Sequence, residues 1–264
     1  MRPTLLLVTL TLLLTACSGG GGAEDAADEA SSAPSSSASP STVAPSTTPA
    51  PTTAAPTTPA VPTTADPVTT PLPRAQWREM RRLGMWREGC PATRAQLRRL
   101  ELNYYDWDGQ VQRGVLVVNR DVAPSLSRIF TRLFEERFPI RRMQSVEAYD
   151  GDSDASLKAD NTAVYNCRRP DQINAPPTAS PHANGRAIDI NPRENPWMDP
   201  RCECWSPIAK YAERTEGKGK ILKGGLVWRL FEKEGWIWQN IDVADYMHFD
   251  TGYPSKPWSS PRDD

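Results

Sequence analysis

The spacing of apolar and polar residues predicts most helices and strands in the C-terminal part of the chain. Apolar residues recur at helical spacing from 122 to 134, which predicts a helix ending before Pro139, and residues 75–86 and 226–234 have similar patterns. Segments with strand character lie at residues 100–104, 114–119, 143–149, 186–190, 235–238 and 246–250, the first two joined as a hairpin. Because these elements alternate without regular βαβ spacing, we expect an α+β fold with a small, mainly antiparallel sheet flanked by helices.

The first residues have the pattern of an export signal. An apolar run from Leu5 to Leu14 follows Arg2, is too short to span a bilayer as a mature helix, and predicts a signal peptide over residues 1–16. The small residues before Cys17 resemble the lipobox of bacterial lipoproteins, in which the cysteine carries the lipid. The alternative is an ordinary signal peptide cleaved at an Ala-x-Ala site.

Composition divides the rest of the chain. Residues 18–73 contain 11 of the 26 prolines and no Lys, Arg or aromatic residue, so we expect a disordered Ser/Thr/Pro/Ala-rich tether over residues 17–73. Residues 74–264 hold all nine tryptophans and fit one compact domain with a net charge of +3. Nucleic-acid-binding proteins are usually far more basic. We therefore expect a monomer with no nucleic-acid partner, lipid-anchored on the extracytoplasmic face of the cell membrane.

The two histidines, both in the domain, each lie near carboxylates. His182 precedes Asp189 by seven residues, and His248 follows Asp245 by three. Two imidazoles and one carboxylate can hold one catalytic zinc ion and leave a fourth position for water. A separation of seven residues would place His182 and Asp189 on opposite faces of a regular strand. The chain must therefore turn between them, and Asn184–Gly185 is a strong turn signal. A zinc ion lowers the pKa of its bound water to about 7, and a neighbouring carboxylate such as Asp245 can accept the proton.

These motifs resemble those of a known family. His-x-x-Gly-x-Ala-x-Asp from His182, preceded by Ser180, and Asp-Tyr-x-His-Phe from Asp245 are similar to the M15 metallopeptidases, which include zinc D,D-carboxypeptidases and L-alanyl-D-glutamate endopeptidases of peptidoglycan. The resemblance covers essentially residues 89–252 and includes the surroundings of Cys90, Cys167 and Arg168. It implies a zinc site in an open cleft, with His182, Asp189 and His248 as the zinc ligands. By the same resemblance, Asp245 would be the general base and Arg168 would meet substrate charge near the metal.

Other residues near the motifs have candidate roles. Ser180 and Asp250 could orient His182 and His248 through their free ring nitrogens. Arg168 suits a developing oxyanion or a substrate carboxylate, and the alternative is an exposed arginine. Gln239 and Asn240 stand where many relatives have two glycines, so bulkier residues are expected near the rim of the cleft.

The cysteines other than Cys17 are even in number: Cys90, Cys167, Cys202 and Cys204. In an oxidising compartment disulfides are favoured over thiolate ligands, and three pairings are open. The motifs shared with the family favour Cys90 with Cys167, which leaves Cys202 to pair with Cys204. A second, structural zinc site is the alternative.

Three functions fit the sequence. The leading hypothesis is a membrane-tethered zinc peptidase that hydrolyses an amide bond in peptidoglycan stem peptides, as a carboxypeptidase or an L-Ala-D-Glu endopeptidase. The alternative is a non-catalytic peptidoglycan-binding lipoprotein of the same fold, which would have no need of Asp245. A small-molecule amidase is the third, because the motifs do not define a specificity pocket.

Overall fold

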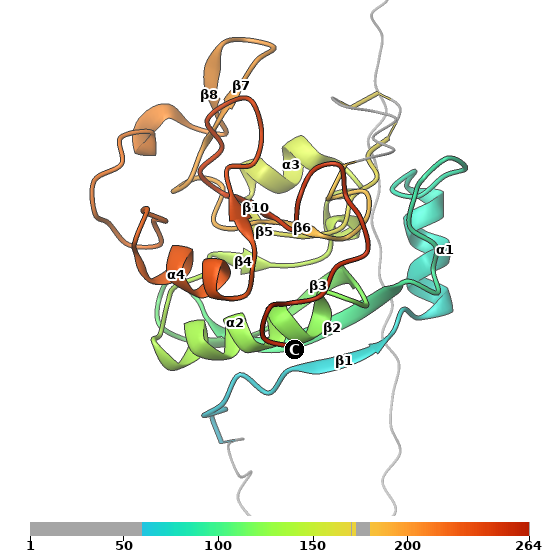
Figure 1. Ribbon diagram of the computed structural model, residues 1–264, viewed down its shortest axis with the longest axis horizontal. Helices are drawn as coiled ribbons and strands as arrows, with labels where there is room; N and C mark the ends of the chain where they lie inside the picture. The colour runs from blue at the N-terminus through green and yellow to red at the C-terminus, as the bar shows by residue number, and fades with distance from the viewer. Residues whose placement is uncertain (1–59, 170, 173–179, 264) are drawn as a thin grey trace, which may run out of the picture. The chain divides into compact units, whose positions relative to one another are not determined.

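A computed structural model describes residues 60–169, 171–172 and 180–263 (Figure 1). The expected signal peptide, Cys17 and the tether up to residue 59 lie outside these residues. The helices in the described part are α1 (Arg74–Arg82), α2 (Ala123–Glu135), α3 (Ser153–Lys158), α4 (Leu226–Lys233) and the short 3₁₀ helices η1 (Val146–Tyr149) and η2 (Ala209–Tyr211). None of them is long and apolar enough to cross a membrane.

The strands of the described part form four small sheets. One sheet has the order β1-β2-β3, from β1 (Val68–Pro71), β2 (Leu97–Tyr105) and β3 (Val111–Asn119). A second has the order β6-β10-β9, from β6 (Ala187–Asp189), β10 (His248–Asp250) and β9 (Ile237–Trp238). The two-stranded sheets pair β4 (Arg142–Met143) with β5 (Asn161–Thr162), and β7 (Trp197–Asp199) with β8 (Cys204–Ser206). All pairs except β4–β5 are antiparallel, which confirms the α+β class expected from the sequence.

The β2–β3 hairpin and helix α2 build the main core. The hairpin confirms the prediction from residues 100–119, and Leu100 lies opposite Leu116. Helix α2 ends at Glu135, before Pro139 as expected, and turns its apolar stripe toward the interior. Four of the core residues of α2 are at most 1 % exposed: Leu126, Ile129, Phe130 and Leu133.

The second sheet has an apolar back that anchors the strands of the site. Ile188 of β6 and Phe249 of β10 are opposite each other in the sheet and fully buried in the main core. The ring of Phe249 stacks on Phe231 of α4, with centroids 4.1 Å apart. Because side chains alternate between the faces of a strand, this packing leaves Asp189 and His248 on the opposite, polar face.

Two elements end earlier in the structure than the sequence pattern predicts. The strand expected at residues 143–149 ends at Met143, because the amide of Asn161 bonds both the N–H and the C=O of Gln144 and ends the ladder there. The chain then enters η1. Helix α1, expected to reach residue 86, ends at Arg82 because Gly84 adopts a positive φ of 72°, as at many helix C-termini.

The end of the Pro- and Thr-rich segment is part of the folded domain. Strand β1 pairs along β2, and the side chains of Ala65 and Leu72 are buried. Threonine and valine favour strands, and Pro71 is tolerated because β1 lies at the sheet edge. The fold therefore begins before Arg74, the boundary that composition indicates, because a few buried residues suffice to add an edge strand.

Two disulfides join Cys90 to Cys167 and Cys202 to Cys204. The first links the loop after α1 to the segment before Arg168, across 77 residues. The second closes the turn of the β7–β8 hairpin. All four cysteines of the domain are thus in disulfides and none is available to a structural zinc ion.

Strand β1 should contribute measurably to stability. Removing residues 1–73 deletes β1, exposes the edge of β2 and removes two buried apolar side chains, so we expect a loss of about 3 kcal/mol in the free energy of unfolding. Removing residues 1–59 is the matched control and should leave the free energy of unfolding unchanged. Urea denaturation of both shortened chains tests this, and equal midpoints would contradict it.

Candidate metal centre

The register of β6 and β10 places two candidate ligands side by side. Asp189 lies directly opposite His248 in this antiparallel pair, a position in which side chains on one face are in contact. Nδ1 of His248 is 3.1 Å from Oδ1 of Asp189. The alternation predicted from the sequence therefore brings the two ligands together without help from a loop.

His182 reaches the same point through the predicted turn. Residues 181–185 form consecutive turns, and the N–H of Gly185 donates to the carbonyl of His182. Gly185 has a φ of 70°, and a Cβ there would lie 2.7 Å from the backbone nitrogen of Asn119. The turn therefore requires glycine, both for its backbone conformation and for the close approach to β3.

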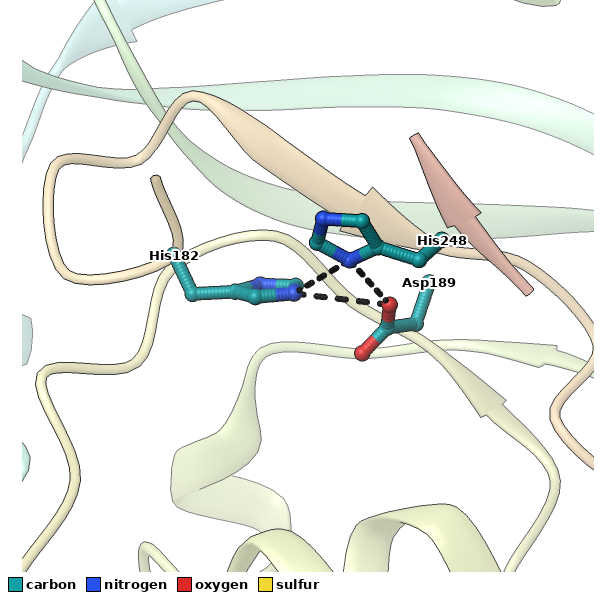
Figure 2. Close-up of side chains that lie close together, drawn as sticks. All are labelled: His182, Asp189 and His248. Carbon is teal, nitrogen blue, oxygen red and sulfur yellow. Dashed lines mark hydrogen bonds and ion pairs between the residues drawn. The ribbon is translucent and has the colours of Figure 1, made fainter. Parts of the chain in front are cut away.

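The three side chains point toward one another (Figure 2). Nε2 of His182 is 3.1 Å from Nδ1 of His248 and 3.4 Å from Oδ1 of Asp189. Two ligand atoms of a tetrahedral zinc ion, each at about 2.0–2.1 Å from the metal, are separated by about 3.3 Å. The three atoms thus form a triangle of the size of one face of a zinc tetrahedron, and the group can hold a metal ion.

The remaining ring nitrogens of both histidines are held by oxygen atoms. Nδ1 of His182 is 2.8 Å from the carbonyl of Val164, and Nε2 of His248 is 3.0 Å from Oδ2 of Asp250. Such partners set the ring orientation and the nitrogen that faces a metal. The sequence offers Ser180 as a candidate partner of His182, but this nitrogen meets the carbonyl of Val164, because the N–H of Asn166 bonds the carbonyl of His182 and brings that segment alongside. The carbonyl of Ser180 accepts from Nδ2 of the turn residue Asn184.

Asp245 lies beside this group with an unsatisfied oxygen. Its side chain is buried, and Oδ1 has no hydrogen-bond partner among the described residues. Burial, with Asp189 nearby, raises the pKa of Asp245 to about 7, against the opposing effects of His248 and Arg168. A carboxyl with a pKa near neutrality and a free oxygen in a cleft suits proton transfer.

Gln239 and Asn240, the positions that depart from the family pattern, each make a hydrogen bond with an aspartate of the site. Oε1 of Gln239 accepts from the N–H of Asp245 at 3.3 Å, and Nδ2 of Asn240 donates to Oδ1 of Asp250 at 3.0 Å. Sequence reasoning placed both residues at the rim and missed these contacts, since nothing in the local pattern shows where their amides point.

Arg168 belongs to the same cleft. It is partly buried and lines the cleft with His182, Asp189 and Asp245, so it is not simply exposed. Burial lowers the pKa of its guanidinium, while Asp189 and Asp245 oppose that effect. The guanidinium is thus close enough to both carboxylates to interact with them electrostatically.

The charges of the group are strongly coupled. Burial disfavours the imidazolium of His248, but the hydrogen bonds with Asp189 and Asp250 outweigh it and raise the pKa of His248 to about 10. Burial alone would raise the pKa of Asp189, but His182 and His248 hold it well below its usual range. In the metal-free protein a proton on His248 thus offsets the negative charge of the carboxylates, a role that a bound cation would take over.

The site opens into a cleft of about 700 Å³. Its walls come from α3, residues 161–168, residues 180–182, the β7–β8 hairpin and the loop between β9 and β10. Residues from both polar and apolar classes line it, among them Asp154, Leu157, Trp197, Ile241, Asp242 and Tyr253. A ligand can therefore reach the His/Asp group from the surface.

Comparison with known proteins gives a match to a family model that covers part of the domain. Residues 174–251 match the M15 peptidase family model described as D-alanyl-D-alanine carboxypeptidase. The match covers less than a third of the chain but includes His182, Asp189, Asp245 and His248. The match supports a place in the M15 family. It therefore also supports a hydrolase with peptidase activity related to peptidoglycan. Neither curated proteins nor solved structures gave a significant match.

The metal-free protein should become less stable as the pH rises. Folded His248 keeps its proton up to about pH 10, whereas an unfolded histidine loses it near 6.5, so this stabilisation is lost above pH 6.5. Asp245 acts in the same direction up to about pH 7, because its folded carboxyl holds a proton that an unfolded one releases. We expect the melting temperature of chelator-treated protein to fall between pH 6.5 and 8.5.

Two controls accompany this measurement by differential scanning calorimetry. Zinc-loaded protein should not show the decline, since metal binding strengthens as protons leave the ligands. His248→Ala should flatten the slope of the metal-free protein. A metal-free wild type whose melting temperature holds constant or rises over this range would contradict the charge arrangement.

Proposed function

We propose that the domain is a zinc peptidase that hydrolyses an amide bond in peptidoglycan stem peptides. The observation that carries this proposal is the buried Asp245 oxygen beside three convergent ligand atoms, inside the segment that matches the M15 model. His182, Asp189 and His248 would hold one zinc ion. A cleft open to the surface accommodates a peptide attached to a larger polymer.

Each residue of the site then has a task. A bound zinc ion supplies a Lewis acid that polarises the scissile carbonyl and acidifies water. Asp245 accepts the proton of the attacking water at Oδ1 and delivers it to the departing nitrogen. Arg168 stabilises negative charge on the substrate, either a carboxylate or the developing oxyanion. Asp250 and the Val164 carbonyl keep the two imidazoles in position.

The rival function, a wall-binding protein without catalysis, explains less of the site. Binding alone does not require a buried carboxylate with an unsatisfied oxygen. Such an oxygen lowers the stability of the fold, and a catalytic role accounts for its presence. Mass spectrometry of muropeptides incubated with the purified domain separates the two functions. The masses of the products also distinguish a carboxypeptidase from an L-Ala-D-Glu endopeptidase.

Asp245→Asn tests the proposed base directly. The substitution keeps the shape of the side chain but removes its proton acceptor, so turnover of a stem peptide should fall by about 10²- to 10⁴-fold. Zinc content should remain at one ion per chain, because Asp245 is not a proposed ligand. His248→Ala is the matched control and should lose zinc. Near-normal turnover of a zinc-loaded Asp245→Asn protein would show that another residue is the base. Loss of zinc would show that Asp245 is a ligand.

The proposal places the enzyme on the outer face of the cell membrane, attached through lipid on Cys17. Cys17→Ser removes the thiol that would carry the lipid, so we expect the protein to move from the detergent phase to the aqueous phase in Triton X-114 partitioning. Peptidase activity of the released protein should be unchanged, because the site lies far along the chain. A Cys17→Ser protein that stays in the detergent phase as fully as the wild type would show that the anchor lies elsewhere.

A further inference from the structure

The backbone of Arg168 has a conformation that its own residue type does not favour. Its φ is 65°, in the left-handed region that residues with a Cβ rarely adopt. Such residues persist only where surrounding contacts hold them, and they are frequent at functional sites. Since Arg168 lines the cleft beside Asp189 and Asp245, its backbone conformation sets the point and direction from which its side chain enters the cleft.

Contacts on both sides hold this backbone. The N–H of Arg168 donates to Oδ1 of Asn166 at 2.7 Å, and its carbonyl accepts a hydrogen bond from Nη1 of Arg87. Arg87 lies in the loop at residues 83–90, which follows α1 and which we call the post-α1 loop (Figure 1). The same loop bonds the preceding residue, Cys167, through the disulfide with Cys90.

The post-α1 loop is itself well fixed. The N–H of Cys90 donates to the carbonyl of Arg87, and the N–H of Arg87 donates to Sγ of Cys90, so the two residues share one turn. Nε1 of Trp86 donates to the carbonyl of Ala92 at 2.7 Å, and its ring lies 4.8 Å from that of Trp77 in α1. The loop can therefore serve as a rigid support for the segment that carries Arg168.

We propose that Arg87 is a positioning residue, which holds Arg168 at positive φ and so keeps the cleft guanidinium directed at the anionic part of the substrate. This inference rests on the proposed function and deepens it. A charged donor on the Arg168 carbonyl is stronger than a neutral one and fixes the carbonyl direction, while the disulfide fixes the residue before it. Arg87, Cys90 and Arg168 all lie outside residues 174–251, the segment that matches the family model.

Kinetics of Arg87→Ala, Arg168→Ala and the double variant test the inference on zinc-loaded protein of full length. Arg87→Ala should lower kcat/KM for a stem peptide by about 10-fold, the usual effect of a hydrogen bond with a charged group, with zinc content unchanged. In the Arg168→Ala background the same substitution should have no further effect, because Arg87 acts through Arg168. A merely structural role would instead give equal losses in both backgrounds and would overturn the inference.

The matched control is Arg94→Ala. Arg94 also donates from its guanidinium to a backbone carbonyl, that of Leu72 at 2.7 Å, but this carbonyl lies away from the cleft. Its loss should leave kcat/KM unchanged. If Arg87→Ala does not fold, Arg87→Lys replaces it. Its single ammonium on a different stem should lower kcat/KM by less, and the substitution should again have no further effect in the Arg168→Ala background. An additive loss of kcat/KM would overturn the inference.

A crystal structure of the zinc-loaded Arg87→Ala protein provides a readout that does not require activity. We expect residue 168 to leave the positive φ region, or its guanidinium to turn away from Asp189 and Asp245. An unchanged Arg168 would overturn the inference whatever the kinetics. If the wild type cleaves no stem peptide, the proposed function fails, and this crystallographic comparison still decides whether Arg87 positions Arg168.

Discussion

The pairing of β6 with β10 is the constraint on which the site depends. It sets Asp189 opposite His248 on one face while Ile188 and Phe249 are buried on the other. A shift of one residue in this register would turn the ligands into the core and the apolar residues into the cleft. The apolar packing against Phe231 therefore favours this register, and the register sets Asp189 and His248, the two candidate ligands, side by side.

The same pairing creates an electrostatic problem that explains the surrounding residues. Asp245 and Asp250 are buried and Asp189 beside them is partly buried, and buried like charges are unfavourable unless cations or hydrogen bonds offset them. Arg168 supplies one fixed positive charge, and a proton on His248 supplies a second. A divalent ion at the His/Asp group would offset these negative charges better than a proton, since it would lie among all three candidate ligand atoms.

Sequence patterns predicted the parts of the fold that depend on local periodicity and turn chemistry. Helix α2, the β2–β3 hairpin, the Asn184–Gly185 turn and the alternation around His248 all follow from such patterns. The end of the strand at Met143 depends on the side chain of Asn161, and β1 depends on an open edge of β2. Both are contacts between segments distant in sequence, which periodicity does not encode.

The site shows the same division between local motifs and distant support. Three ligand candidates and Asp245 lie within two short motifs, and their chemistry identifies them. The carbonyl of Val164 and the guanidinium of Arg87 have no recognisable signature, because any residue offers a carbonyl and most arginines lie on surfaces. A match limited to residues 174–251 therefore includes the metal group but omits Arg168 and its support, although Arg168 lines the same cleft. In the proposed function, the residue that meets substrate charge and the residues that hold it thus lie outside the segment that carries the metal motifs.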